Sequence, residues 1–181
     1  MSFNTKKLLQ KFRVPLGFVF AIVFLFLAKP TFTYLLIGGS VAFLGLLLRA
    51  WSAGHIRKNK QLTVSGPYAY TRNPLYLGSF LLGVGFMIAS GIWWLALIFS
   101  VLYLGIYFPV MSVEAEELTE IFGDEYKNYA DGVSLFFPWF SKYASNEKGF
   151  EKSLYLKYRE YQAALGFLFV LAILAAKTYF F

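Results

Sequence analysis

The 181-residue chain contains no cysteine and only one histidine, His55. The lack of cysteine excludes disulfides, thiolate metal sites and cysteine nucleophiles. A single histidine cannot build a histidine cluster, and the glutamates of the chain lack the accompanying histidines of di-iron bundles. We therefore expect no metal, and chemistry carried by tyrosine, arginine and carboxylate side chains.

Charged residues are also scarce, at 15% of the chain, whereas 58% of the residues are hydrophobic and 21% aromatic. This composition is far more apolar than that of a soluble domain and predicts one integral membrane domain over residues 1–181. The formal net charge of +7 favours binding to anionic lipid headgroups. Nucleic acid is not expected as a partner, because the basic residues flank apolar runs instead of forming an exposed surface.

Five apolar runs approach the ~20 residues that a helix needs to cross a bilayer. They cover residues 14–28, 31–48, 75–89, 92–110 and 161–176. The first run follows four basic residues, as in a signal peptide, but no small-residue cleavage pattern follows it, so we interpret it as a span. Short breaks at Lys29-Pro30 and Ser90-Gly91 predict two helical hairpins. The predicted fold is all-α, with about five transmembrane helices.

Lysine and arginine are distributed unevenly around these spans. All of the 17 except Lys29 and Lys177 fall on the side that holds the N-terminus in a five-span arrangement. By the positive-inside rule this side faces the cytoplasm. We therefore expect the N-terminus and the polar loops in the cytoplasm, and the C-terminus on the opposite side.

The stretch LTVSGPYAYTRNPLYLG, residues 62–78, is a polar passage between apolar runs. Its Gly66-Pro67 pair predicts a turn, and Asn73-Pro74 predicts the start of a helix at the proline. Three tyrosines and Arg72 are crowded into this passage at the expected membrane surface. This combination predicts a functional site.

A second polar region, residues 111–152, holds nine of the ten acidic residues. From 112 to 129 its apolar residues recur at three- and four-residue spacing, which predicts an amphipathic helix with a bend or cap at Gly123. Glu114, Glu117 and Asp124 fall roughly on one face of this helix. They form either a solvated face or a set of carboxylates that binds a cationic ligand or pairs with Arg72.

The two motifs together resemble a known family. GPYAYTRNPLYLG at residues 66–78 is followed, after a helical hairpin, by EAEELTEIFGDEYKNY at residues 114–129. This order resembles the integral-membrane methyltransferases that include isoprenylcysteine carboxyl methyltransferase and the phospholipid N-methyltransferases. The resemblance covers about residues 62–139. It implies that S-adenosylmethionine binds in a cytoplasmic pocket between the third and fourth spans, the Gly-Pro-Tyr loop and the acidic helix, and that a lipophilic acceptor enters from the bilayer.

Three departures from the family pattern are visible. Asn73 stands where the family usually has histidine, which removes a titratable ring. The family's paired glutamates fall on Glu114 and Ala115, whereas the pair Glu116-Glu117 lies two residues later. The arginine that many carboxyl methyltransferases place shortly before the glutamates is absent from residues 110–112.

The resemblance and the residue chemistry together give eight candidate cofactor contacts. They are Val64, Gly66, Tyr68, Arg72, Asn73, Tyr76, Glu114 and Glu117. Aromatic faces stabilise a sulfonium by about 0.5–2 kcal/mol, which assigns Tyr68 and Tyr76 to the cofactor wall. Arg72 or backbone amides near Gly66 can hold the cofactor carboxylate. Arg72, Glu114 and Glu117 are the candidate catalytic residues, and Glu116 is expected to matter less.

The leading prediction is methyl transfer from S-adenosylmethionine to a lipophilic acceptor, in the manner of isoprenylcysteine carboxyl methyltransferase. Phospholipid amine N-methylation and a non-catalytic lipid-binding protein of the same fold are the alternatives. A transporter is disfavoured, because no predicted span carries a charge at mid-depth. Arg72 is the only arginine within the two motifs, so its engagement with the cofactor would favour a neutral or amine-bearing acceptor.

Overall fold

The computed structural model describes residues 19, 21–57, 61–138, 143 and 149–180. Within these ranges every regular element is helical, which confirms the all-α prediction. The elements are α2 (Phe32–Ala53), the 3₁₀ helix η1 (Gly66–Ala69), α3 (Pro74–Ala89), α4 (Trp93–Phe122), α5 (Asp124–Gly132), α6 (Lys152–Lys157) and α7 (Tyr161–Phe180).

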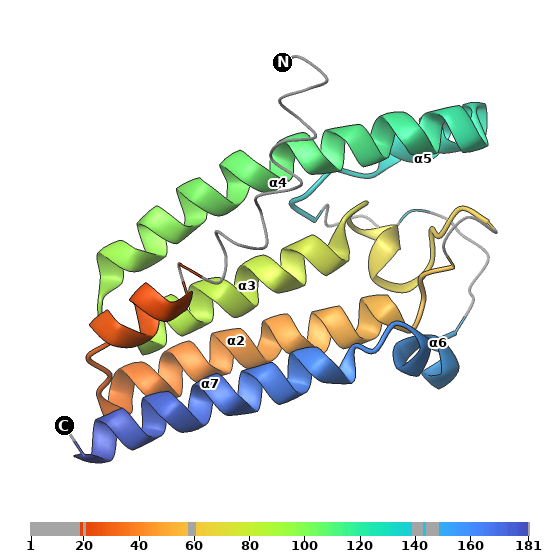
Figure 1. The fold of residues 1–181 in the computed structure, drawn as a ribbon. Helices are drawn as coiled ribbons and strands as arrows, with labels where there is room; N and C mark the ends of the chain where they lie inside the picture. The colour runs from red at the N-terminus through yellow and green to blue at the C-terminus, as the bar shows by residue number, and fades with distance from the viewer. Residues whose placement is uncertain (1–18, 20, 58–60, 139–142, 144–148, 181) are drawn as a thin grey trace.

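Four long helices form the body of the protein, packed in the order α4, α3, α2, α7 (Figure 1). The connection from α3 to α4 lies at one end of this bundle, together with the end of α7. The loop that carries η1 lies at the other end, with α5 and α6. All the polar loops with candidate site residues therefore gather at one end, as predicted.

Three helices, α2, α4 and α7, are long and apolar enough to cross a membrane, and α3 is a shorter apolar helix. Their outward faces carry exposed aliphatic and aromatic side chains, such as Leu97 on α4 and Phe169 on α7. Four of the five predicted spans correspond to these helices. The first, residues 14–28, lies partly outside the described residues, although 21–27 are helical.

Two helices extend past the charged residues that end the predicted runs, because those charges find partners inside the protein. Arg49 lies within α2 and pairs with Glu160. Lys177 lies within α7, where its Nζ donates to the carbonyls of Leu25 at 2.9 Å and Phe26 at 3.3 Å. A charge at the end of an apolar run therefore does not end either helix.

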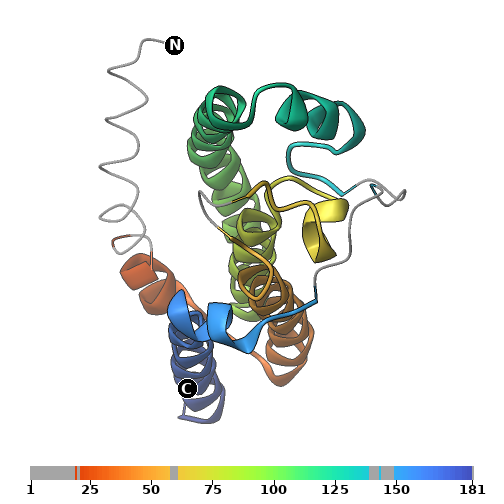
Figure 2. The same ribbon diagram turned by 90° about the vertical axis from the view of Figure 1, so that its right-hand side faces the viewer.

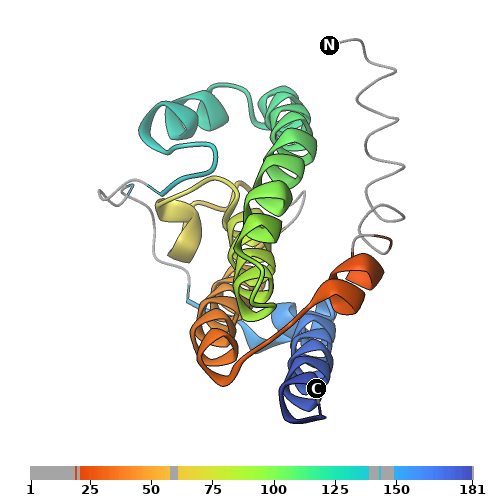
Figure 3. The same ribbon diagram turned by 90° about the vertical axis from the view of Figure 1, so that its left-hand side faces the viewer.

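Helix α4 joins the fourth predicted span to the amphipathic helix. Its 30 residues correspond to about 45 Å, well beyond the ~30 Å hydrocarbon core of a bilayer. The helix breaks at Gly123, whose φ of 55° is unfavourable for other residues, and α5 begins at Asp124. Figures 2 and 3 show α5 turned back beside the end of α4. The predicted break at Gly123 is confirmed, and it folds the acidic region over the η1 loop.

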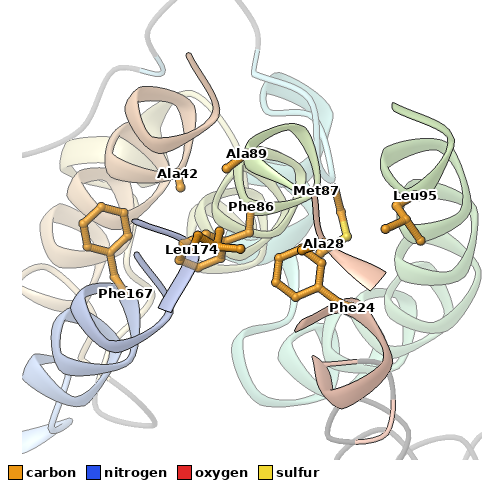
Figure 4. Packing of buried hydrophobic residues seen from close by; sticks show 9 residues of the cluster. All are labelled: Phe24, Ala28, Ala42, Phe86, Met87, Ala89, Leu95, Phe167 and Leu174. Atoms are coloured by element: carbon orange, nitrogen blue, oxygen red, sulfur yellow. The ribbon is translucent and has the colours of Figure 1, made fainter. Parts of the chain in front are cut away.

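Small residues allow α2 and α3 to pack in backbone contact. A Cβ on Gly85 would lie 2.3 Å from the backbone nitrogen of Ala42, and one on Gly38 would lie 2.2 Å from that of Ala89. Figure 4 shows Ala42 and Ala89 between the larger side chains of the core, which α7 completes with Phe167. This close approach is typical of helix pairs in lipid. Helices there gain no hydrophobic free energy by associating, so small residues that allow close van der Waals packing are favoured at their interfaces.

We expect Gly85→Ala to destabilise the protein by about 1–3 kcal/mol, because the added methyl group meets backbone atoms that cannot move aside. A thermal melt in detergent measures the effect. Gly105→Ala is the matched control, since a Cβ there has no atom within 4 Å and alanine favours the helix. Equal melting temperatures for the two variants would contradict the proposed backbone contact.

Candidate active site

The η1 loop is held by groups from α2 and α5. Gly66 has a φ of +60°, and its backbone lies against the ring of His55, so that a Cβ at this position would be 2.6 Å from the imidazole. The imidazole Nδ1 lies 2.8 Å from the carbonyl of Trp51, one turn earlier in α2. From the other side the hydroxyl of Tyr129 donates to the carbonyl of Tyr68 at 2.6 Å. The predicted turn at Gly66-Pro67 therefore presents a fixed backbone to the site.

The residues that follow are anchored to the segment after α5. The backbone nitrogen of Arg72 donates to the Ser134 carbonyl at 2.9 Å. The Asn73 side-chain amide donates to the Leu135 carbonyl at 3.0 Å, and the Thr71 hydroxyl donates to the Phe136 carbonyl at 2.8 Å. Asn73 thus uses its amide nitrogen to tie the loop to the segment after α5, which gives the departure from the family's histidine a structural role.

Arg72 projects into a cleft of about 340 Å³ between α4, α5 and the loop. This volume falls at the lower end of the range of small-molecule sites. The lining residues come from both motifs and carry charges of both signs; they are Arg72, Ser112, Ala115, Glu116, Thr119, Tyr126, Lys127, Ala130, Asp131 and Leu135.

The described residues satisfy only part of the hydrogen-bonding capacity of the Arg72 guanidinium. Its Nη1 donates to the hydroxyl of Tyr126 at 3.3 Å, and its Cζ lies 5.9 Å from the centre of that ring. Its Nε is buried and has no hydrogen-bond partner among the described residues. A buried donor of this kind costs free energy unless a ligand or water completes it, so the position is suited to an anionic group.

Beside the cleft, the hydroxyl of Tyr76 donates to Glu114 Oε1 at 2.7 Å. Tyr76 lies in the first turn of α3, and its carbonyl accepts a hydrogen bond of 2.8 Å from Tyr103 of α4. Its ring packs against Tyr107, which stacks on Tyr103 with ring centroids 4.2 Å apart. Glu114 is therefore a half-buried carboxylate at the end of a column of tyrosines.

The positions of Glu116 and Glu117 differ from those expected from the spacing of the glutamates along the helix. Both side chains are exposed, but Glu116 lines the cleft and Glu117 is not among the lining residues. The reason is that α5 and the segment that follows it cover the side of α4 that carries Ala115 and Thr119. Successive residues of a helix differ by about 100° in direction, so the covering element decides which glutamate faces the site.

Tyr68 has a buried hydroxyl with no hydrogen-bond partner in the described part of the chain. Burial, reinforced by the nearby Tyr129 and Glu114, raises the pKa of the Tyr68 phenol above its ordinary value of 10.0. The phenol therefore stays protonated and offers a donor, which suits an uncharged or anionic acceptor group on a ligand. Val64, in contrast, packs on the cluster of Tyr126, Tyr129 and Val133, which is a structural role.

Sequence reasoning did not identify the cleft residues of α5, Tyr126 and Lys127, as members of the site. It also did not predict that the carbonyls of residues 134–136 accept hydrogen bonds from residues 71–73. Tyr126 and Tyr129 lie three residues apart at the end of the acidic motif, and this spacing is the signal in the sequence for a buried face of α5. Among the described residues, no group of three histidine, aspartate or glutamate side chains is placed to hold a metal ion.

Residues 40–125 match the model of the phospholipid methyltransferase family. This match confirms the resemblance to the membrane methyltransferases and extends it back from residue 62 into α2. The matched residues include most of α2 and all of α3 and α4, and α2 and α4 are two of the three described helices long and apolar enough to cross a membrane.

The chain is also similar to the cobalt-zinc-cadmium resistance protein CzcN of Cupriavidus metallidurans, at 36% identity over 114 residues. The alignment covers 60% of this chain and 49% of the relative, so the chain spans about half the length of that relative. The metal resistance in the name is a property of that protein. No solved structure matches the chain.

Proposed function

We propose that this chain, whose residues 40–125 match the phospholipid methyltransferase family, transfers a methyl group from S-adenosylmethionine to a lipophilic acceptor at the membrane. The observation that carries the proposal is the partly unsatisfied guanidinium of Arg72 in a cleft between the two motifs. A cofactor carboxylate is the anionic group that would complete it.

The lining of the cleft fits the amino-acid part of S-adenosylmethionine, which carries one positive and one negative charge. Arg72 supplies the cation for the carboxylate, and Glu116 supplies a carboxylate for the ammonium. The ring of Tyr126, which lines the cleft, supplies an aromatic face. The proposal extends the cofactor site beyond this lining to the buried hydroxyl of Tyr68 and the ring of Tyr76. Sulfonium binding on aromatic faces is worth about 0.5–2 kcal/mol.

When bound, the cofactor supplies an activated methyl group: its methyl–sulfur bond breaks as the acceptor's lone pair forms the new bond, and the sulfide leaves. The task of the protein is alignment and the exclusion of water, and alignment alone is worth up to ~7–11 kcal/mol. Rigid donors and backbone ties around Arg72 and Tyr76 serve this task. Neither a covalent intermediate on the protein nor a metal is required for such a displacement.

Two acceptor classes are compatible with the site, a prenylcysteine-type carboxylate and a phospholipid amine. Glu114 favours the amine, because a carboxylate beside the reacting atom can accept the proton that an amine must lose. A carboxylate acceptor would instead need a nearby cation to offset its desolvation. Lys127 also lines the cleft but pairs with Asp124, and the partly buried Arg49, outside the two motifs, is engaged with Glu160. We also propose, from the distribution of lysine and arginine, that the site faces the cytoplasm and the C-terminus the opposite side.

The test is a calorimetric titration of S-adenosylmethionine onto the purified protein in detergent, followed by labelling of two acceptors. With a radioactive methyl group, base-labile label on a farnesylcysteine analogue supports a methyl ester, and base-stable label on phosphatidylethanolamine supports N-methylation. We expect cofactor binding and base-stable label. Absence of cofactor binding would overturn the proposed function, whereas binding without label on either lipid supports the non-catalytic alternative.

A further inference from the structure

We infer that Arg49 and Glu160, which belong to neither motif, position Tyr76 for its contact with Glu114. The inference rests on the proposed function, because it assigns these residues to the same site. These two residues form the most buried ion pair among the described residues. Arg49 Nε lies 2.5 Å from Glu160 Oε1 and Nη2 lies 3.0 Å from Oε2, with the glutamate side chain only 8% exposed.

The remaining donor of Arg49 continues the network into α3. Its Nη1 donates to the hydroxyl of Ser79, which in turn donates to the carbonyl of Leu75 at 2.8 Å. The aliphatic part of Arg49 crosses directly over Gly78, where a Cβ would lie 2.7 Å from Arg49 Cγ. The ion pair therefore holds the first two turns of α3 from the side of α2 and α7.

Tyr76 lies inside these two turns and is held from the opposite side as well. Tyr103 of α4 donates to its carbonyl at 2.8 Å, so its backbone is fixed between α4 and the Arg49 network. The hydroxyl of Tyr76 then meets Glu114 at 2.7 Å. A shift or rotation of α3 would move this hydroxyl first, because it lies at the end of the side chain.

The C-terminal segment would remain attached to the end of α2 without the Arg49–Glu160 ion pair. The same segment is attached to the end of α2 by a second ion pair, between Arg57 and Glu151, whose glutamate side chain is 46% exposed. The backbone nitrogen of Glu151 also donates to the Gly54 carbonyl at 2.9 Å. Only Glu160 reaches α3, through Arg49 and Ser79. Glu151 is therefore the matched control, an attachment without a link to Tyr76.

The first measurement needs no ligand. The full chain is prepared in detergent with 3-fluorotyrosine, and the ¹⁹F resonance of Tyr76 is identified by its loss in Tyr76→Phe. We expect this resonance to shift or broaden in Glu160→Gln and in Arg49→Met/Glu160→Leu, and to stay in place in Glu151→Gln. The double variant removes both charges together, so that no unpaired buried charge is left to unfold the protein. An unchanged Tyr76 resonance in the folded double variant would overturn the inference.

The second measurement is a double-mutant cycle on the dissociation constant for S-adenosylmethionine. We expect Glu160→Gln to weaken binding about fivefold in the wild-type background and to have almost no effect in the Tyr76→Phe background, because coupled residues are not additive. Equal fold-changes in both backgrounds indicate a purely structural role and count against the inference. If the wild type does not bind the cofactor but the Tyr76 resonance moves as expected, the proposed function fails and the positioning role stands.

Discussion

Arg72→Ala is expected to weaken S-adenosylmethionine binding about 10- to 150-fold, as a hydrogen bond to a charged group contributes roughly 1.5–3 kcal/mol. Arg72 is the only arginine that lines the cleft in the described part of the chain, and its Nε has no protein partner there. Arg72→Lys should recover part of the affinity, because it keeps the charge but loses the planar fork. Calorimetric titration in detergent measures all three dissociation constants.

Two controls separate cofactor binding from folding. Tyr126→Phe removes the 3.3 Å hydrogen bond to Arg72 but keeps the ring, so its affinity should stay within about threefold of the wild type. Arg57→Ala removes a cation at the same end of the bundle that pairs with Glu151 and does not line the cleft. Its affinity should be unchanged. Wild-type binding by a folded Arg72→Ala variant would remove the basis of the cofactor assignment.

Helices and turns of this protein follow from the sequence because their causes are local. Apolar runs, Gly66-Pro67, Asn73-Pro74 and Gly123 each determine structure within a few residues of themselves. The family resemblance adds the order in which these elements surround the site. The local sequence pattern does not indicate which other element packs against a given face of a helix.

The acidic motif illustrates this limit. The periodicity from residue 112 onward indicates a helix, but the direction of each glutamate depends on where α5 returns after Gly123. That return places Glu116 at the cleft and leaves Glu117 outside its lining, so the prediction of a cofactor contact at Glu117 now has less geometric support than one at Glu116. Both remain to be tested by substitution.

Arg49 and Glu160 show the same limit over a greater distance. They are 111 positions apart, and in the sequence each is one charged residue at the edge of an apolar run. Only the packing of α7 against α2 brings them together. The sequence therefore did not reveal that Arg49, a partly buried arginine outside the motifs, contacts α3.

Glu114→Gln is expected to give the largest effect on catalysis. The direction of the change in rate distinguishes an amine acceptor from a carboxylate acceptor. With an amine acceptor, loss of the carboxylate removes the group that takes up the proton, and the rate should fall about 100-fold or more. With a carboxylate acceptor, the same change removes a like charge beside the reacting oxygen, so the rate should stay equal or rise. The rate of label transfer to each lipid, at saturating S-adenosylmethionine, measures the two cases.

The substitution keeps an oxygen that can accept the 2.7 Å hydrogen bond from Tyr76, so the site geometry should persist and the cofactor affinity should change less than about threefold. Glu117→Gln is the matched control, since Glu117 is exposed on the same helix, whereas Glu114 is half-buried and accepts the hydrogen bond from Tyr76. It should leave the transfer rate unchanged. A large loss in Glu117→Gln with no change in Glu114→Gln would mean that Glu117 is the catalytic carboxylate and Glu114 is not.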